Sequence, residues 1–250
     1  MNTISINDQP FTAPQNWSEM GQAELLKWVK IIHKQLSRTD AFALAVITFY
    51  KIKPRLYFKL EPAHHVQLKN TVAFLAEENL LNRWLIPSIK VSTFTRFYGP
   101  EDYLSSSTIK EFRFCELFYH NYARTKKTEF LDKLIATLFR PKGNCDVDDR
   151  DKLTRSIIAK NCRKVTKLAV HEKHAILFNY EGCRNAIFKA YPKIFKSNGT
   201  DAKSNETPDL ENIINVVSGG KFGTFIQTEE TLIYRFLDHL ENEIEENQKR

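Results

Sequence analysis

Glycine is scarce in this sequence of 250 residues, which contains only 8, whereas phenylalanine is abundant at 18. Few glycines argue against a sheet-rich fold with many tight turns, because such turns often need the positive φ angles that glycine tolerates. Scarce glycine also argues against the glycine-lined loops that bind nucleotide cofactors. The composition therefore favours a protein that is not rich in sheet and that binds no cofactor.

Long apolar runs are also missing. The longest candidate, "AFALAVITFY" at residues 41–50, lies between Asp40 and Lys51 and has about half of the roughly 18 residues that indicate a membrane helix. The opening segment, "MNTISINDQPFTAPQNW", has no basic stretch followed by an apolar core, so we expect no secretory signal. These features predict a cytoplasmic protein that does not act in a membrane.

Motifs of the common enzyme classes are lacking too. The four cysteines are far apart, with no pair at the two-residue spacing of a zinc knuckle or a redox pair; they are Cys115, Cys145, Cys162 and Cys183. No serine elbow and no dinucleotide fingerprint occurs. We therefore expect reduced thiols and a protein that is not an enzyme.

One short stretch, "HEKH", keeps a metal-dependent enzyme among the hypotheses. It places His171 and His174 three residues apart with Glu172 between them. The zinc-protease pattern needs two histidines four residues apart, so this spacing does not match it. Two histidines at this spacing can still bind a metal, but no second cluster of ligands is visible to complete the coordination shell. The metal hypothesis therefore ranks third, behind the two described below.

Helical periodicity dominates what the sequence does contain. Leu25, Trp28, Val29 and Ile32 recur at helical spacing, and similar patterns follow along the chain, so we predict a mainly α fold, a multi-helix bundle in two lobes. Residues 41–50 fit either a buried helix or a central strand, and both alternatives stay open. The alternation in "SIKVSTFTRFY" predicts one short strand or extended segment near residues 91–98.

Composition changes along the chain suggest five segments. Pro10 and Pro14 indicate an extended arm, and Pro141, Gly143 and the aspartates after them indicate an internal boundary. Residues 197–209 contain few hydrophobic side chains, which is typical of a flexible linker. The predicted segments are an extended N-terminal arm (1–17), an N-terminal helical lobe (18–143), a basic helical hairpin (144–196), the linker (197–209) and a C-terminal helical segment with an acidic tail (210–250).

The stretch "SSSTIKEFRFCELFYHNY" predicts a helix with a defined start. Thr108 and Glu111 have the spacing of a capping box, in which each side chain satisfies a backbone amide of the first turn. Phe112, Phe118 and Tyr122 follow on one side of this helix. Such a face is most simply part of the core, so we interpret the stretch as a helix entry rather than as a reactive site.

The most basic feature is a predicted helix over residues 152–173. Six cations share one broad face of this helix: Lys152, Arg155, Lys160, Arg163, Lys164 and Lys167. The whole chain carries a net charge of +7, and such a face could contact phosphates. No recognition helix, zinc finger or RNA-binding signature accompanies it. A nucleic-acid-binding accessory protein is therefore the alternative functional hypothesis.

Four stretches together resemble a known group of proteins. They are "FYGPEDYLSSSTIKEF", "LIATLFRPKG" followed by an acidic turn, "AILFNYEGCRNAIFKAYPKIF", and "GGKFGTF" before a last helix. This combination is similar to helical proteins of phage and prophage tail gene clusters of Bacteroidetes-type bacteria. The resemblance implies a virion component or a tail assembly factor, located in the host cytoplasm or in the virion. It transfers no functional residue.

The leading hypothesis combines this resemblance with the residue patterns. A helical body with aromatic and basic faces is suited to docking on other proteins. We therefore expect a non-enzymatic protein-interaction protein of phage or mobile-element origin, without a cofactor. Its expected partners are other assembly proteins or further copies of itself.

Overall fold

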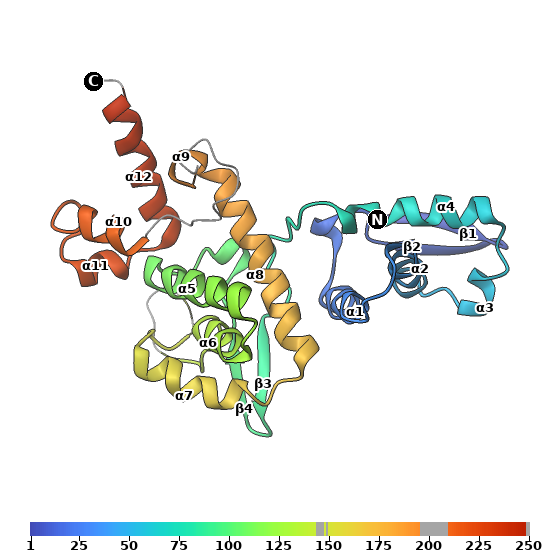
Figure 1. The fold of residues 1–250 in the computed structure, drawn as a ribbon, viewed down its shortest axis with the longest axis horizontal. Coiled ribbons are helices and arrows are strands. Elements are labelled where there is room, and N and C mark those ends of the chain that lie inside the picture. The colour runs from blue at the N-terminus through green and yellow to red at the C-terminus, as the bar shows by residue number, and fades with distance from the viewer. Residues whose placement is uncertain (144–147, 149, 196–209, 249–250) are drawn as a thin grey trace. The chain divides into compact units, whose positions relative to one another are not determined.

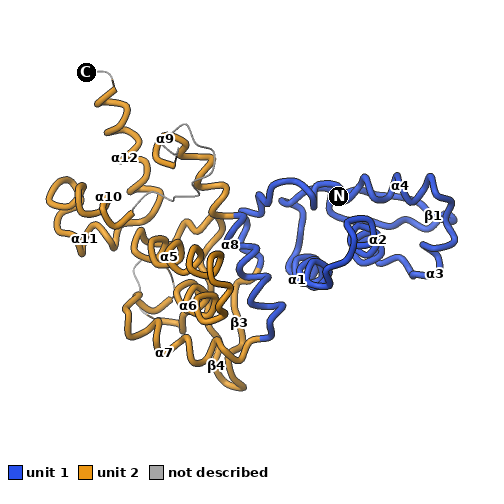
Figure 2. The backbone as a smooth tube through the Cα atoms, in the orientation of Figure 1, with its two compact units in different colours: residues 1–85, 169–182 blue, residues 86–168, 183–250 orange. Residues whose placement is uncertain are grey.

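The computed structural model describes residues 1–143, 148, 150–195 and 210–248. The chain divides into two compact units, unit 1 with residues 1–85 and 169–182, and unit 2 with residues 86–168 and 183–250 (Figure 1, Figure 2). The described residues form twelve α-helices and two small antiparallel strand pairs. The prediction of a mainly α fold is therefore confirmed. No helix within these ranges is both long and apolar enough to cross a membrane.

Unit 1 packs a strand pair and four helices of the N-terminal region with the first part of a later helix. Its elements are β1 (Asn2–Ile6), β2 (Gln9–Ala13), α1 (Gln22–Ile32), α2 (Arg38–Phe49), α3 (Pro54–Tyr57), α4 (Pro62–Thr71) and the start of α8 (Val170–Ala190). Trp17 packs edge-on against Phe74 and lies 5.4 Å from the ring of Phe178 on α8. Asn179 on α8 accepts a hydrogen bond from the amide of Leu85 at 2.8 Å. These contacts bring the distant α8 segment into the core of unit 1.

Within the segment 1–17, for which we expected an extended arm, residues 2–13 form an antiparallel hairpin in which Ile4 pairs with Phe11. Asn7 and Asp8 make the turn, both with positive φ, and asparagine and aspartate are among the residues that adopt this conformation most readily. Pro10 is tolerated because a two-stranded sheet has only edge strands. The alternation of "TISI" followed by Asn-Asp was the signal for this hairpin.

Residues 41–50, for which helix and strand both stayed open, lie almost entirely in α2. The hydroxyl of Ser37 accepts a hydrogen bond from the Asp40 amide at 3.1 Å and so caps the helix start. Ala45, Val46 and Phe49 bury one side of the helix. The cap and the alanines therefore outweigh the β-branched residues near the end of this segment.

Unit 2 contains a second strand pair and the remaining helices. Its elements are β3 (Ser88–Ser92), β4 (Thr95–Tyr98), α5 (Ile109–Thr125), α6 (Thr128–Leu138), α7 (Arg155–Val165), the end of α8, α9 (Pro192–Phe195), α10 (Leu210–Val217), α11 (Phe225–Glu229) and α12 (Ile233–Gln248). Helix α6 packs against both α5 and α7, and α7 also contacts β3. The single strand or extended segment expected near residues 91–98 corresponds to the end of β3, the turn after it and the whole of β4.

The predicted segment boundaries differ from the two units. The N-terminal lobe (18–143) is divided after Leu85, and the basic hairpin (144–196) is divided after Leu168 and again within α8 after Gly182. The Pro141–Gly143 stretch separates α6 from α7, yet both helices belong to unit 2 because their apolar faces bury against each other. A loop signal therefore did not indicate a domain boundary here. The linker predicted at 197–209 lies outside the described residues.

Candidate functional site

Helix α7 is the element on which the sequence placed its basic face, and it is shorter than predicted. The hydroxyl of Thr154 accepts a hydrogen bond from the Ile157 amide at 3.2 Å, so the helix starts at Arg155. The helix ends at Val165. A turn and then α8 follow, so residues 152–173 do not form one helix. Ile158, Asn161 and Val165 form the buried side of α7.

The six predicted basic residues are consequently not on one face. Two flank the helix: Lys152 precedes it and pairs with Glu230 at 2.8 Å, and Lys167 follows it. The Nζ of Lys164 lies 5.5 Å above the ring of Phe97, so this residue packs against the β3–β4 hairpin. Arg155, Lys160 and Arg163 remain exposed on α7.

An apolar groove of about 490 Å³ lies between α5, α6 and α7. Phe114 and Phe118 of α5 contribute aromatic rings to it, stacked with their centroids 6.1 Å apart. Helix α7 contributes residues at helical spacing, with Ile158 and Ala159 as apolar members. We call this feature the α5–α7 groove.

Cations surround the apolar part of the α5–α7 groove. Arg155 and Arg163 of α7 line it, and Lys133 of α6 lines it from another side. In the part of the chain that the structure describes, neither arginine makes an ion pair. The groove therefore combines an apolar surface with an edge of positive charge.

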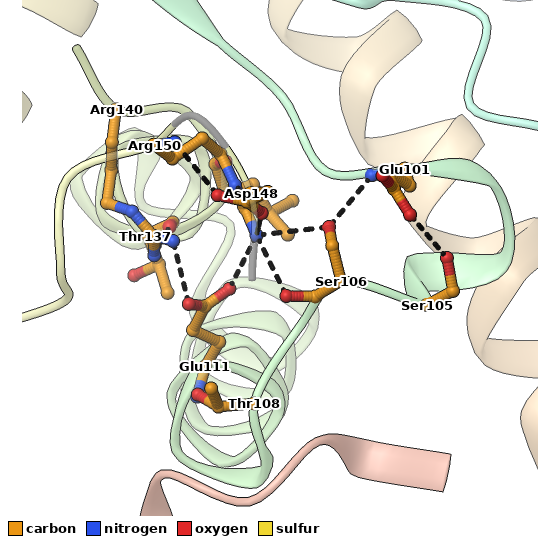
Figure 3. Close-up of polar contacts among 10 residues, drawn as sticks. Glu101, Ser105, Ser106, Thr108, Glu111, Thr137, Arg140, Asp148 and Arg150 are labelled. Carbon is orange, nitrogen blue, oxygen red and sulfur yellow. Dashed lines mark hydrogen bonds and ion pairs between the residues drawn. The ribbon is translucent and has the colours of Figure 1, made fainter. Parts of the chain in front are cut away.

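A buried cluster of charges holds the elements of the groove together (Figure 3). Glu111 on α5 accepts a hydrogen bond from Arg140 after α6 at 2.7 Å and one from Arg150 before α7 at 3.1 Å. Both arginines are 1% exposed, and Glu111 is 4% exposed. One carboxylate therefore links the helix entry of α5 to the end of α6 and to the segment that leads into α7.

The remaining contacts of the cluster nearly satisfy its charges. Arg150 donates to Asp148 at 2.6 Å and to the carbonyl of Leu138 at 2.9 Å. Burial opposes ionisation of Asp148, but the hydrogen bonds and charge of Arg150 outweigh burial and lower the pKa of this carboxyl. The carboxylates of Glu111 and Asp148 thus balance the charges of the two arginines. We interpret the cluster as a contact that fixes the positions of these segments rather than as a reactive centre.

The predicted capping box at Thr108 and Glu111 is only half formed. The Thr108 hydroxyl accepts a hydrogen bond from the Glu111 amide at 3.2 Å, as expected. The carboxylate of Glu111, however, turns to Arg140 and Arg150 instead of returning to the Thr108 amide. A complete capping box occurs elsewhere, between Thr224 and Gln227 at the start of α11, where the sequence pattern was not recognised.

The histidines of the metal hypothesis lie at the start of α8, in unit 1. The ring of His174 packs 4.0 Å from that of His33, and its Nδ1 lies 2.9 Å from the carbonyl of Val170. Burial, and then the neighbouring His33, lower the pKa of His174. Within the described ranges, no group of three or more histidine, cysteine, aspartate or glutamate side chains could hold a metal ion.

Cys162 is the one cysteine among the described residues that lines the α5–α7 groove, and its side chain is partly exposed. Burial raises the pKa of Cys183 to about 12, and burial followed by the charge of Glu111 raises that of Cys115 well above its normal value. Cys162 is therefore the most accessible of these three thiols.

Comparisons with known proteins give no family for this chain. No protein-family model matches the sequence. Neither a search of characterised proteins nor a search of solved structures finds a match.

Proposed function

We propose that this chain is a non-enzymatic protein-interaction protein whose α5–α7 groove binds an acidic amphipathic helix of a partner protein. The observation that carries the proposal is the groove itself, with apolar walls from Phe114, Phe118 and Ile158 and cations at its edge. Amphipathic helices commonly bind by laying an apolar face into such a groove. Opposite charges at the edge then select an acidic sequence and set its direction.

The dimensions of the groove suit this role. Its volume of about 490 Å³ falls in the range of sites that bury several apolar groups. Arg155 and Arg163 are two turns apart on α7, so they can contact acidic residues spaced along a docked helix. Arginine also pairs with carboxylates through two parallel hydrogen bonds, which favours a defined orientation.

The proposed biological setting comes from the resemblance to phage tail-cluster proteins. In that setting the chain would act in particle or tail assembly, in the cytoplasm of the host or in the virion. The partner is another assembly protein or a further copy of this chain. No cofactor takes part in this role.

A substitution that fills the groove tests the proposal. Ala159 is exposed and lines the groove, so Ala159→Trp should block docking while leaving every charge in place. Ala123 is exposed on α5 and does not line the groove, which makes Ala123→Trp the matched control. We expect capture of the partner from nuclease-treated native lysate to fall at least about tenfold for Ala159→Trp only. Equal capture by both variants would contradict the proposal.

The chemistry of the occupant is tested with a crosslinker placed on α7 outside the groove. In a background with Cys145→Ser and Cys162→Ser, a benzophenone maleimide attached after Lys160→Cys should label the protein captured by the groove. Mass spectrometry of the crosslinked peptide should identify an acidic amphipathic segment, and Arg155→Glu with Arg163→Glu should abolish the crosslink. A crosslink to a basic or non-amphipathic segment would show that the occupant is of another kind.

Nucleic-acid binding is the second candidate, because the exposed cations of α7 also suit phosphates. Arg155, Lys160, Arg163 and Lys167 are exposed, and none makes an ion pair with a residue in the described ranges. Lys160 does not line the groove, so Lys160→Glu separates the two functions. The Lys160→Glu variant should bind DNA or RNA more weakly, and this binding should depend less on salt concentration. Capture of the protein partner should stay unchanged.

A further inference from the structure

The β3–β4 hairpin of unit 2 presents an aromatic ring to solvent at its tip. Figure 1 shows the path of the β3–β4 hairpin. Phe94 lies in the turn between the two strands and is 98% exposed. Neither Thr93 nor Phe94 has positive φ, so this turn does not require the residue types of the usual two-residue hairpin turns. Phe94 buries almost no surface within the chain, so the stability of the fold does not explain why an aromatic residue occupies this position.

The exposed face of the same hairpin carries two cations opposite each other. Lys90 and Arg96 are direct cross-strand partners, and both are exposed. Like charges in this position destabilise a strand pair. Arg96 donates to the Ser88 hydroxyl at 2.8 Å, but it makes no ion pair with a residue that the structure describes. A polyanionic ligand would turn this repulsion into attraction.

Strand alternation gives this face a second aromatic residue. Ile89 and Phe97 form the buried side of the hairpin, so Arg96 and Tyr98 share the opposite side with Lys90. Tyr98 is 36% exposed. Cations and aromatic rings therefore alternate along one surface that ends in Phe94.

We infer that the β3–β4 hairpin is a binding site for single-stranded nucleic acid, in which Phe94 stacks on an unpaired base and Lys90 and Arg96 contact flanking phosphates. Aromatic rings interspersed with cations are the usual means of binding single strands without sequence preference. The hairpin lines no part of the α5–α7 groove, so the inference goes beyond the protein-interaction proposal. It shares its ligand class with the second candidate but uses other residues.

The residues around Phe94 favour a nucleic acid over a lipid surface. The turn and its flanks carry hydroxyl groups on Ser92, Thr93 and Thr95, and these groups would lose hydrogen bonds to water if the tip entered hydrocarbon. Stacking on a base needs a single exposed ring and leaves the neighbouring hydroxyls hydrated. Hydroxyl groups can also donate hydrogen bonds to phosphate oxygens.

The test places a fluorescent reporter at the hairpin tip. The three native tryptophans, Trp17, Trp28 and Trp84, are all buried, so Phe94→Trp adds one solvent-exposed emitter. Phe58 is 70% exposed and lies in unit 1, so Phe58→Trp is the matched control. The probe is an oligothymidylate of about 12 nucleotides, a length within the usual range for one binding site.

We expect the oligothymidylate to quench Phe94→Trp emission at low salt and to leave Phe58→Trp emission unchanged. Phe94→Ala should weaken binding, measured by fluorescence anisotropy, about fivefold or more, because one stacked ring is lost. Lys90→Glu with Arg96→Glu should weaken it further and reduce its salt dependence. Ile226→Ala and Lys30→Glu, which change exposed residues elsewhere, should bind as the unchanged chain does.

Three results would overturn the inference. Oligothymidylate binding that is weakened by Lys160→Glu but unaffected by the hairpin variants would assign nucleic acid to α7 alone. Absence of oligothymidylate binding would remove the hairpin site and leave the groove proposal standing. A response of Phe94→Trp to vesicles of phosphatidylserine and phosphatidylcholine, without a response to the oligonucleotide, would make the hairpin a lipid contact.

Discussion

Glu111 shows how one buried side chain determines the position of three segments. Its carboxylate joins Arg140 and Arg150, which are 29 and 39 residues further along the chain. Removing one partner from a buried ionic cluster leaves uncompensated charge in a region of low dielectric constant. The stability of unit 2 should therefore depend strongly on this one residue.

We predict that Glu111→Gln lowers the free energy of unfolding by about 3–5 kcal/mol, because two buried guanidinium groups lose their shared anion. Urea unfolding followed by far-UV circular dichroism measures the change. Glu245→Gln is the control, since Glu245 pairs with Lys193 in an exposed position and should cost less than about 1 kcal/mol. Similar losses of unfolding free energy in both variants would show that the buried cluster stabilises the chain no more than an exposed ion pair does.

We predict that the stability of unit 1 depends on pH because of His174. Its pKa in the folded chain is lowered below the ordinary 6.5 by burial, then by His33 and Lys173. The folded state therefore binds fewer protons than the unfolded state, so stability is retained above pH 6.5 and is lost as the pH falls through the folded pKa.

His174→Gln should make unit 1 less sensitive to acid than the unchanged chain. Tryptophan fluorescence during urea unfolding reports this unit, because Trp17, Trp28 and Trp84 all belong to it. The comparison covers the range from about pH 7 to pH 5, where histidine titrates. His64→Gln, at an exposed position, should keep the original pH dependence; an equal effect of both substitutions would contradict this interpretation.

At the scale of elements, several helix starts follow from local side-chain contacts. Ser37, Thr108 and Thr154 each accept a hydrogen bond from a backbone amide in the first turn of α2, α5 and α7. Such contacts span only three residues, so the sequence pattern can reveal them. The packing of α8, in contrast, depends on a residue from far along the chain.

Gly182 is a position on α8 where the backbone of Leu81 approaches closely. A Cβ atom at this position would lie 2.3 Å from the Leu81 carbonyl oxygen. We expect Gly182→Ala to destabilise unit 1 by about 1–3 kcal/mol, because a rigid backbone cannot yield as a flexible side chain can. Gly21→Ala, which also lies in unit 1, is the control, because its Cβ would meet only the flexible side chain of Glu24 and should cost less than Gly182→Ala in the same tryptophan-monitored urea titration. A neutral Gly182→Ala would mean that α8 shifts to accept the methyl group.

At the scale of the whole molecule, the chain has two compact units with separate cores. Unit 1 contains Trp17 and Phe74, whereas unit 2 contains Phe97, Phe112 and the Glu111 cluster. Chains of this kind often unfold in more than one step. The distribution of tryptophan makes the steps distinguishable.

We expect tryptophan fluorescence and far-UV circular dichroism to give unfolding curves that do not coincide, because only circular dichroism reports both units. Glu111→Gln should shift the part of the dichroism transition that belongs to unit 2 and leave the tryptophan midpoint in place. Superimposable curves that move together in this variant would instead show that the chain unfolds as one cooperative body.

The candidate site was predictable only in part. The basic character of α7 and the aromatic side of α5 could be recognised from spacing, and Arg155 and Arg163 are among the predicted contact residues. That Lys164 packs above Phe97 and that Lys152 pairs with Glu230 could not be recognised. These contacts join residues more than 60 positions apart, so no pattern of neighbouring residues could predict them.

The sequence by itself determined the mainly α character and the cap at Thr108, because periodicity and capping act between residues a few positions apart. Only the tertiary structure decided that Glu111 faces two arginines, that α8 is divided between the units, and that α5, α6 and α7 leave a groove between them. The physical reason is that burial of apolar surface is non-directional, so the segments that finally share a core depend on the packing of the whole chain.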